Sequence, residues 1–157
     1  MHSRIFQVSS SPIKKEDYIE EYRYEDYFVP SHADYVVEQT DKESIKSDLE
    51  WLSNHNGIVV DIGKKTITIT SKEEFFTEKH DKFKELAGQL SNISLEDFIS
   101  DKKYFDFYEL KELYDDQHGF YIDDNDEYMG YASLDHWIRN AEEGKVYYIG
   151  AIFDYHF

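Results

Sequence analysis

The stretch GIVVDIGKKTITIT, residues 57–70, decides the fold. Two runs rich in β-branched residues flank Gly63, and glycine at the first position of a two-residue loop fits a type II′ turn. Because loop length fixes the register of a hairpin, this turn pairs aliphatic side chains across the strands: Val60 with Ile67, and Ile58 with Ile69. The stretch therefore predicts a β-hairpin with one apolar face that covers a core.

Helical patterns lie on both sides of this hairpin. Before it, apolar residues recur at helical spacing over residues 42–55. After it, Ser71 and Glu74 form a capping-box pattern. Residues 71–90 then carry an apolar face of Phe76, Phe83, Leu86 and Leu90. We expect the isoleucines of the hairpin to pack against this second helix. A third helix is expected to begin at Ser94, with a break near Lys103 before a further helical segment.

The ends of the chain carry strand patterns. Residues 3–8, 119–122 and 145–155 fit strands, and residues 13–27 fit a short surface helix. Residues 134–141 fit a short helix that is capped by Ser133. A chain of 157 residues has the size of one domain, so residues 1–157 are expected to form a single domain. The predicted class is α+β, a mainly antiparallel sheet with helices packed on one face.

The acidic residues are concentrated in two blocks. Residues 15–50 hold twelve Asp or Glu against four Lys or Arg, a net charge of −8. Residues 96–127 hold twelve against three, a net charge of −9. Residues 51–95 carry six of each sign and are neutral. Both acidic blocks also contain tyrosines, whose rings combine an apolar body with a polar tip. This composition suits a surface that contacts another molecule.

The net charge of −17 excludes some classes of partner. Nucleic-acid phosphate and anionic lipid are repelled, so direct binding to DNA, RNA or a membrane is not expected. The chain has no apolar run of the roughly 18 residues that span a bilayer, and residues 1–7 lack the pattern of a signal peptide. With no cysteine, the sequence agrees with a reducing compartment, and a cytoplasmic protein is predicted.

Motifs for catalysis and metal binding are not found. The acidic run at residues 123–127 fails as an EF-hand in either register, because Tyr128 or Met129 stands where glycine is needed. The sequence contains no HExxH, P-loop or G-x-S-x-G pattern. We therefore predict no catalytic residue, metal ligand or cofactor. A hydrolase or cation-binding protein that uses Asp and His clusters, such as Asp116 with His118, is the alternative.

The acidic and tyrosine-rich segments are the predicted working surface. We expect a non-enzymatic module that binds a basic protein surface, with unknown oligomeric state. The predicted partner-binding residues are Glu20, Glu21, Tyr24, Glu25, Asp26, Tyr27, Tyr108, Glu109, Glu112, Asp115 and Asp116. The competing interpretation is a solvated acidic face with partly packed tyrosines.

Two segments carry a resemblance to known proteins. SRIFQVSSSPIKKEDYIEE at residues 3–21 and ADYVVEQTDKESIKSDLEWL at residues 33–52 resemble small acidic proteins of unknown function from accessory and mobile DNA of Gram-positive gut bacteria. The resemblance covers about a third of the chain and implies a setting in which acidic proteins inhibit nucleases by imitating DNA. A DNA mimic must align many carboxylates on one elongated face, since duplex DNA carries one charge per about 1.7 Å. DNA mimicry therefore requires the two acidic blocks to adjoin in the fold.

Overall fold

The computed structural model describes residues 1–126 and 130–157, whose strands form a seven-stranded mixed sheet. The strands are β1 (His2–Ser9), β2 (Tyr35–Glu38), β3 (Ile58–Asp61), β4 (Thr66–Ile69), β5 (Tyr121–Asp124), β6 (Tyr131–Ser133) and β7 (Val146–His156). The order is β3-β4-β7-β1-β5-β6. Strand β2 pairs with the C-terminal end of β7, whereas β4 pairs with its N-terminal end. Only the β1–β5 pair is parallel among the described strands. The predicted α+β class with a mainly antiparallel sheet is confirmed.

Helices occupy most of the chain between the strands. They are α1 (Val29–His32), α2 (Lys42–Ser53), α3 (Lys72–Ser91), α4 (Leu95–Ile99), α5 (Tyr104–Tyr114) and α6 (Leu134–Asn140). The helix predicted over residues 13–27 is wrong, because two short 3₁₀ turns stand there instead, η1 (Lys15–Asp17) and η2 (Glu21–Tyr24). The predicted serine caps are confirmed: side chains of Ser71, Ser94 and Ser133 each accept a hydrogen bond from the backbone N–H three residues later.

The β3–β4 hairpin has the predicted register, with Val60 opposite Ile67 and Ile58 opposite Ile69. The predicted type II′ turn is wrong, since positive φ occurs at Lys65 and not at Gly63. The carboxylate of Asp61 explains this geometry, because its Oδ1 accepts a hydrogen bond from the backbone N–H of Lys64 at 3.0 Å. The Lys65 side chain is then fixed against β7, where its Nζ donates to the Gly150 carbonyl at 2.7 Å.

Both faces of the sheet bury a hydrophobic cluster. On one face, Phe6, Ile67 and Ile122 pack with side chains from α2, α6 and the start of α3. On the other face, Ile5 and Phe153 pack with aromatic residues from η2 and the segment around α1. The longer helices therefore cover one face of the sheet, and a series of short turns covers the other. We call the sheet with these covering elements the body.

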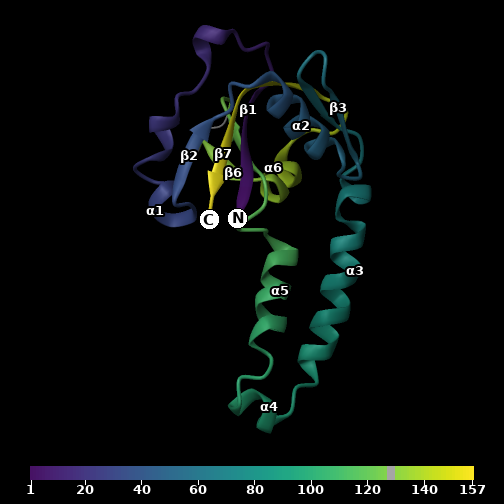
Figure 1. The fold of residues 1–157 in the computed structure, drawn as a ribbon. Coiled ribbons are helices and arrows are strands. Elements are labelled where there is room, and N and C mark those ends of the chain that lie inside the picture. The colour runs from purple at the N-terminus through teal and green to yellow at the C-terminus, as the bar shows by residue number, and fades with distance from the viewer. Residues whose placement is uncertain (127–129) are drawn as a thin grey trace.

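Helices α3, α4 and α5 extend away from the body as a hairpin, which we call the arm (Figure 1). The 20 residues of α3 give the arm a length of about 30 Å at 1.5 Å per residue. The isoleucines of β3 and β4 therefore meet only the first turns of α3, at Phe75 and Phe76. The expectation that they also pack against Phe83, Leu86 and Leu90 is wrong, because that part of α3 has left the body and lies beside α5.

No helix within the described parts of the chain has both the length and the apolar character that crossing a bilayer requires.

Candidate protein-interaction surface

The root of the arm is fixed to α6 by two basic side chains. The Lys79 ammonium in α3 lies 2.7 Å from both carboxylate oxygens of Asp135, which is buried. The Arg139 guanidinium lies between two rings, 4.9 Å from the centre of Phe76 and 4.7 Å from that of Tyr114. Arg139 also donates a hydrogen bond to the Tyr114 carbonyl at the end of α5. Both helices of the arm are thus anchored where they leave the body.

Further out, α3 and α5 pack against each other through the apolar residues predicted for a core. Phe83 in α3 lies 6.2 Å from Tyr114, measured between ring centres. Leu90 is buried, and Leu86 and Leu110 are half-buried. The apolar face of each helix packs against the other helix. The outer faces of the arm therefore remain free for contacts with other molecules.

The tip of the arm exposes large apolar side chains. Five of them have an exposed fraction between 57% and 78%: Leu95, Phe98, Ile99, Tyr104 and Phe105. An aromatic side chain can bury about 150–250 Å². Five large residues at this exposure make a patch of several hundred Å², the size at which exposed apolar surface marks an interaction site. The tip is the strongest candidate for a protein contact.

Local hydrogen bonds set the shape of the tip. The Ser94 hydroxyl caps α4 by accepting from the backbone N–H of Asp97 at 3.1 Å, and it donates to the Asp97 carboxylate at 3.0 Å. Lys102 lies 3.3 Å from the other oxygen of Asp97. The hydroxyl of Ser94, followed by the Lys102 ammonium, lowers the pKa of Asp97 below its ordinary value. The apolar residues are therefore presented on a defined turn that is closed by polar contacts.

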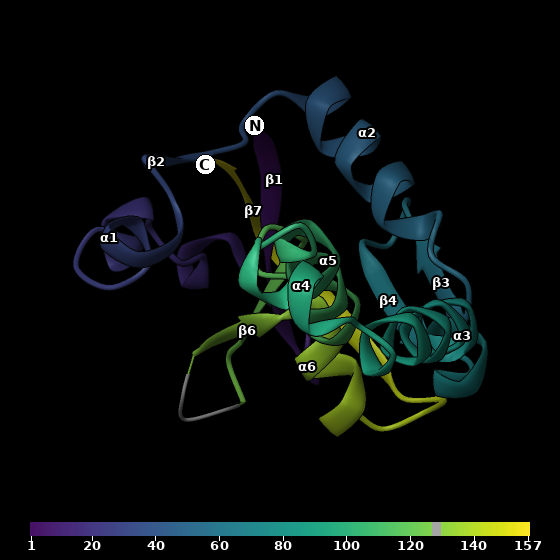
Figure 2. The ribbon, with the colours of Figure 1, turned by 90° about the horizontal axis from the view of Figure 1, so that it is seen from below.

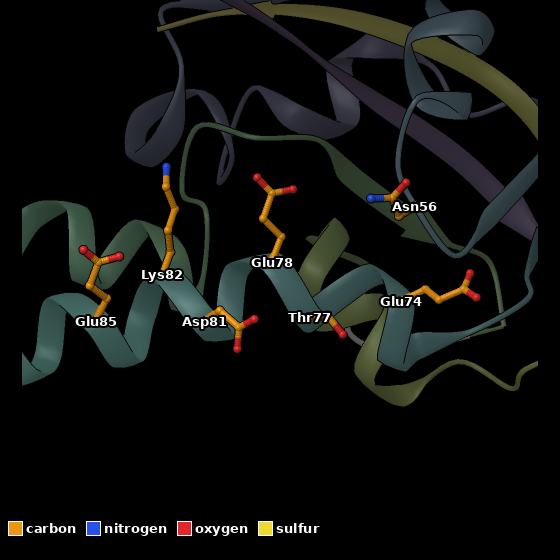
Figure 3. A pocket seen from close by; sticks show the side chains of 7 residues that line it. All are labelled: Asn56, Glu74, Thr77, Glu78, Asp81, Lys82 and Glu85. Atoms are coloured by element: carbon orange, nitrogen blue, oxygen red, sulfur yellow. The ribbon is translucent and has the colours of Figure 1, made fainter.

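The flank of α3 carries a shallow acidic groove of about 600 Å³. Figure 3 shows its side chains following the helix from Glu74 to Glu85, with Lys82 among the carboxylates. The acidic residues stand at positions i, i+4, i+7 and i+11: Glu74, Glu78, Asp81 and Glu85. This spacing places them along one side of a helix. The arm thus combines an apolar tip with an acidic flank.

Helix α5 carries Tyr108 and Glu112 four residues apart, and Asp116 follows shortly after the helix ends at Tyr114. Burial, reinforced by the neighbouring Asp116 carboxylate, raises the pKa of Glu112. Among residues 1–126 and 130–157, the buried Glu112 Oε1 atom has no hydrogen-bond partner. The pKa of Tyr108 is raised by desolvation and then by the charge of Glu112. The predicted residues of the second block are therefore close neighbours on the arm, with exposed Glu109 beside them.

Two predicted residues at the end of α5 are engaged within the protein. The Asp115 carboxylate accepts a hydrogen bond from the Ser133 hydroxyl at 2.5 Å, where β6 meets α6. The Asp116 carboxylate accepts from the backbone N–H of His118 at 3.0 Å. Both carboxylates help to join the arm to the body, which leaves the rest of α5 as the better candidate for outside contacts.

The predicted residues of the first block lie on the body. Glu20, Glu21, Glu25 and Asp26 are exposed, and Tyr27 is 75% exposed. Tyr24 is a correction, since its side chain is fully buried and cannot reach a partner. Its hydroxyl donates to the carboxylate of Asp123 at 3.0 Å, and burial followed by the charge of Asp123 raises its pKa strongly. Tyr24 covers the sheet instead of presenting a ring to solvent.

The two acidic blocks do not form one continuous row. In both views α1 and the 3₁₀ turns before it lie apart from α4 and α5 (Figure 1 and Figure 2). Four acidic residues of the blocks and of α6 are also buried and serve the interior: Asp48, Asp123, Asp124 and Asp135. The charge of the sequence blocks is thus divided between the core, the surface of the body and the arm.

Two Asp and His pairs that are close in the sequence, Asp116 with His118 and Asp135 with His136, are not joined through the imidazole. The His118 ring is stacked on Phe157, with ring centres 4.3 Å apart, and Asp116 accepts from the backbone of His118 and not from its ring. Asp135 pairs with Lys79, although His136 follows it in the sequence. A base oriented by a carboxylate needs a hydrogen bond to the imidazole nitrogen. The geometry gives no support to the predicted alternative of a hydrolase at these residues.

The acidic run at residues 123–127 continues into residues outside those described. Within the described part, Asp123 and Asp124 point to opposite faces of β5, as neighbours on a strand do. Asp123 meets Tyr24, and Asp124 Oδ2 accepts from the indole N–H of Trp137 at 2.8 Å. No cluster of three or more His, Asp or Glu side chains suited to a metal ion occurs among residues 1–126 and 130–157.

Two features of the arm are missing from the predicted site. The α3 carboxylates lie in the segment whose net charge is zero, so counting charge by blocks hides them. Their i, i+4, i+7, i+11 spacing is the signal that finds them. The tip residues Leu95, Phe98 and Ile99 have the spacing of an ordinary buried helix face. That no element in the described part of the chain covers them is a property of the tertiary fold, which the local pattern does not contain.

Comparison of the chain with protein-family models, curated proteins and solved structures gave no match.

Proposed function

We propose that the protein is a non-enzymatic interaction module that binds a basic protein surface through its arm. The supporting observation is the apolar tip, because five large side chains exposed on a structured turn are unusual for a surface that contacts only water. Aromatic residues in such a position supply most of the free energy of binding in many interfaces. The arm presents these residues well away from the body (Figure 1).

Charge defines the complementary partner. The acidic groove lies along the part of α3 nearer the body, between the body and the apolar tip, and the whole chain carries a net charge of −17. A partner with an apolar pocket and a basic rim matches both features, and its approach is accelerated by the long-range field. A second copy of the same chain matches the apolar patch but is repelled by the charge.

DNA mimicry is a narrower form of the same proposal. It requires an unbroken row of carboxylates, whereas Lys82 interrupts the row on α3 and the first block lies on the body. The broader proposal needs only an acidic flank beside an apolar contact. We therefore favour recognition of a basic protein over imitation of duplex DNA, and we retain a setting in mobile bacterial DNA as a hypothesis from the sequence resemblance.

The proposal is tested by capture of proteins from a host lysate at low and high salt. Two variants probe the arm, the double substitution Phe98→Ser with Phe105→Ser and the triple substitution of Glu78, Asp81 and Glu85 to Lys. We expect both to lose capture, because one removes the apolar contact and the other reverses the flanking charge. Exposed residues contribute little to stability, so circular dichroism should show intact folds.

The matched control replaces Glu20, Glu21, Glu25 and Asp26 together with Lys on the body. Retained capture in this variant would assign the contact to the arm alone, and reduced capture would add the first acidic block to the interface. Unchanged capture by both arm variants would contradict the proposal. In that case the acidic surface serves solubility.

A further inference from the structure

A cavity of about 610 Å³ lies in the body, away from the arm. It is formed by the end of β5, the strand β6, one side of α6 and the start of β7. Its walls include Asp124, Asp126, Tyr131, Trp137, Lys145 and Tyr147. This volume falls within the range of about 300–1,000 Å³ that is usual for small-molecule sites. The cavity also lies at the carboxyl ends of the parallel strands β1 and β5, where ligands of open sheets commonly bind.

Four aspartates are buried in the described structure, and three of them are neutralised by a basic side chain. These pairs are Asp48 with Arg4 at 2.7 Å, Asp123 with Arg23 at 3.2 Å, and Asp135 with Lys79 at 2.7 Å. A buried carboxylate without a cation loses hydration energy that hydrogen bonds to neutral groups recover only in part. Each of these three buried aspartates therefore has its counter-ion within the fold.

Asp124 is the exception. It is 6% exposed, and within residues 1–126 and 130–157 no Lys or Arg nitrogen lies within the 4.0 Å of an ion pair. Its carboxylate accepts from the Trp137 indole at 2.8 Å and from the backbone N–H of Asp126 at 3.0 Å. Both donors are neutral. Asp124 is also the buried aspartate that lines the cavity, so the missing cation has a place to bind.

The other walls of the cavity suit a cation. The rings of Trp137 and Tyr147 meet edge to face with centres 5.0 Å apart, and aromatic faces attract ammonium and guanidinium groups. Asp126 adds a second carboxylate, which Ser10 holds in place through a backbone N–H at 2.6 Å. The ammonium of Lys145 lies over the Tyr147 ring, 5.1 Å from its centre, and among the described residues it makes no ion pair with Asp124.

We propose that this cavity binds a small organic cation, a primary amine or a guanidinium compound. Asp124 is its buried counter-ion, Asp126 a second acidic contact, and Trp137 with Tyr147 the aromatic wall. The ligand cation takes the place that Arg4, Arg23 and Lys79 take at the other buried aspartates. The proposal does not depend on the function of the arm.

The site is tested by titration with phenethylamine and with agmatine, which carry an amine on an aromatic body and a guanidinium on an aliphatic one. The chain has two tryptophans, so Trp51→Phe leaves Trp137 as the fluorescent reporter. We expect saturable binding of at least one of these cations, confirmed by calorimetry. The neutral analogue 2-phenylethanol should bind more weakly than phenethylamine, because it cannot neutralise Asp124.

Asp124→Asn keeps an acceptor for the Trp137 indole and removes the charge. We expect it to weaken cation binding by about 10-fold or more, as loss of a charged hydrogen bond does. Glu96→Gln, which removes a charge at the tip of the arm, is the matched control and should leave the affinity unchanged. If Asp124→Asn does not fold, Asp126→Asn and the NMR shift of the Trp137 indole proton on titration of the parent chain provide the same comparison.

Several results would overturn the proposal. They are the absence of saturation by either cation at millimolar concentration, equal binding of phenethylamine and 2-phenylethanol, and unchanged affinity in the aspartate variants. Calcium binding that depends on Asp124, with no binding of the organic cations, would replace the proposal with a metal site.

Discussion

Arg139 in α6 and Tyr114 in α5 join the body to the arm. The guanidinium lies 4.7 Å from the centre of the Tyr114 ring and donates a hydrogen bond to the Tyr114 carbonyl. On its other side it meets Phe76 of α3. One side chain of the body therefore contacts both helices of the arm, beside the pair that Lys79 forms with Asp135.

Arg139→Ala should loosen the root of the arm. Loss of the two cation–π contacts and of the charged hydrogen bond should lower the free energy of unfolding by about 1–3 kcal/mol. Hydrogen exchange should accelerate most in α5, while amides of β1 and β7 change only with global stability. Lys84→Ala, on an exposed position of α3, is the control and should change neither quantity. Uniform acceleration across the sheet and α5 would show that the arm is not a separate unit.

Tyr24→Phe should destabilise the body, because it removes the hydroxyl that donates to the buried carboxylate of Asp123. The expected loss is about 1–3 kcal/mol, the cost of leaving a buried acceptor with one fewer donor. Urea denaturation measures it. Tyr22→Phe, at an exposed tyrosine two residues earlier, should be neutral. Equal effects of the two substitutions would mean that the Tyr24 hydroxyl contributes no stability.

Ile67→Ala should destabilise the protein by about 2–5 kcal/mol, as truncation of a fully buried aliphatic side chain does. Ile67 faces the main core from β4, opposite Val60. Val59→Ala, on the exposed face of the same hairpin, should cost far less. A small effect at Ile67 together with a large one at Val59 would mean that the strands face the other way.

Glu112→Gln should stabilise the protein at neutral pH. Burial and the Asp116 carboxylate raise the pKa of Glu112 in the folded state above its ordinary value. The folded protein then binds the proton more tightly than the unfolded chain, so this group's contribution favours folding at low pH and is lost as pH rises through the raised pKa. The melting temperature of the variant should exceed that of the parent at pH 7, and the difference should shrink as the pH falls through the raised pKa toward the ordinary one. A difference that grows on acidification would contradict this assignment.

The sequence predicts local structure well wherever turn and cap chemistry act alone. The hairpin register follows from alternating β-branched residues, and the helix starts follow from Ser71, Ser94 and Ser133. The predicted type II′ turn is wrong, because the contact between the Asp61 carboxylate and the backbone outweighs the preference for a positive φ at Gly63. The parallel pairing of β1 with β5 joins residues more than a hundred positions apart, and no local pattern records it.

The candidate site was harder to predict from the sequence, because exposure depends on tertiary structure. Tyr24 and Tyr27 stand three residues apart in the same acidic segment, and one is buried while the other is exposed. Phe83 and Phe98 both have helical spacing, but α5 covers the first and no described element covers the second. Charge and periodicity identify surfaces that can contact a partner. The fold decides which of them do.

The most direct test of the arm as the binding element is photocrosslinking in the host cell. Benzoylphenylalanine placed at Phe98 reports the tip, and the same group at exposed Val59 on β3 reports the body. Binding through the arm should give a crosslink from position 98 to a basic protein, weaker after Glu78, Asp81 and Glu85 are changed to Lys, and no such product from position 59. Equal products from both positions, or a product from position 59 alone, would contradict it.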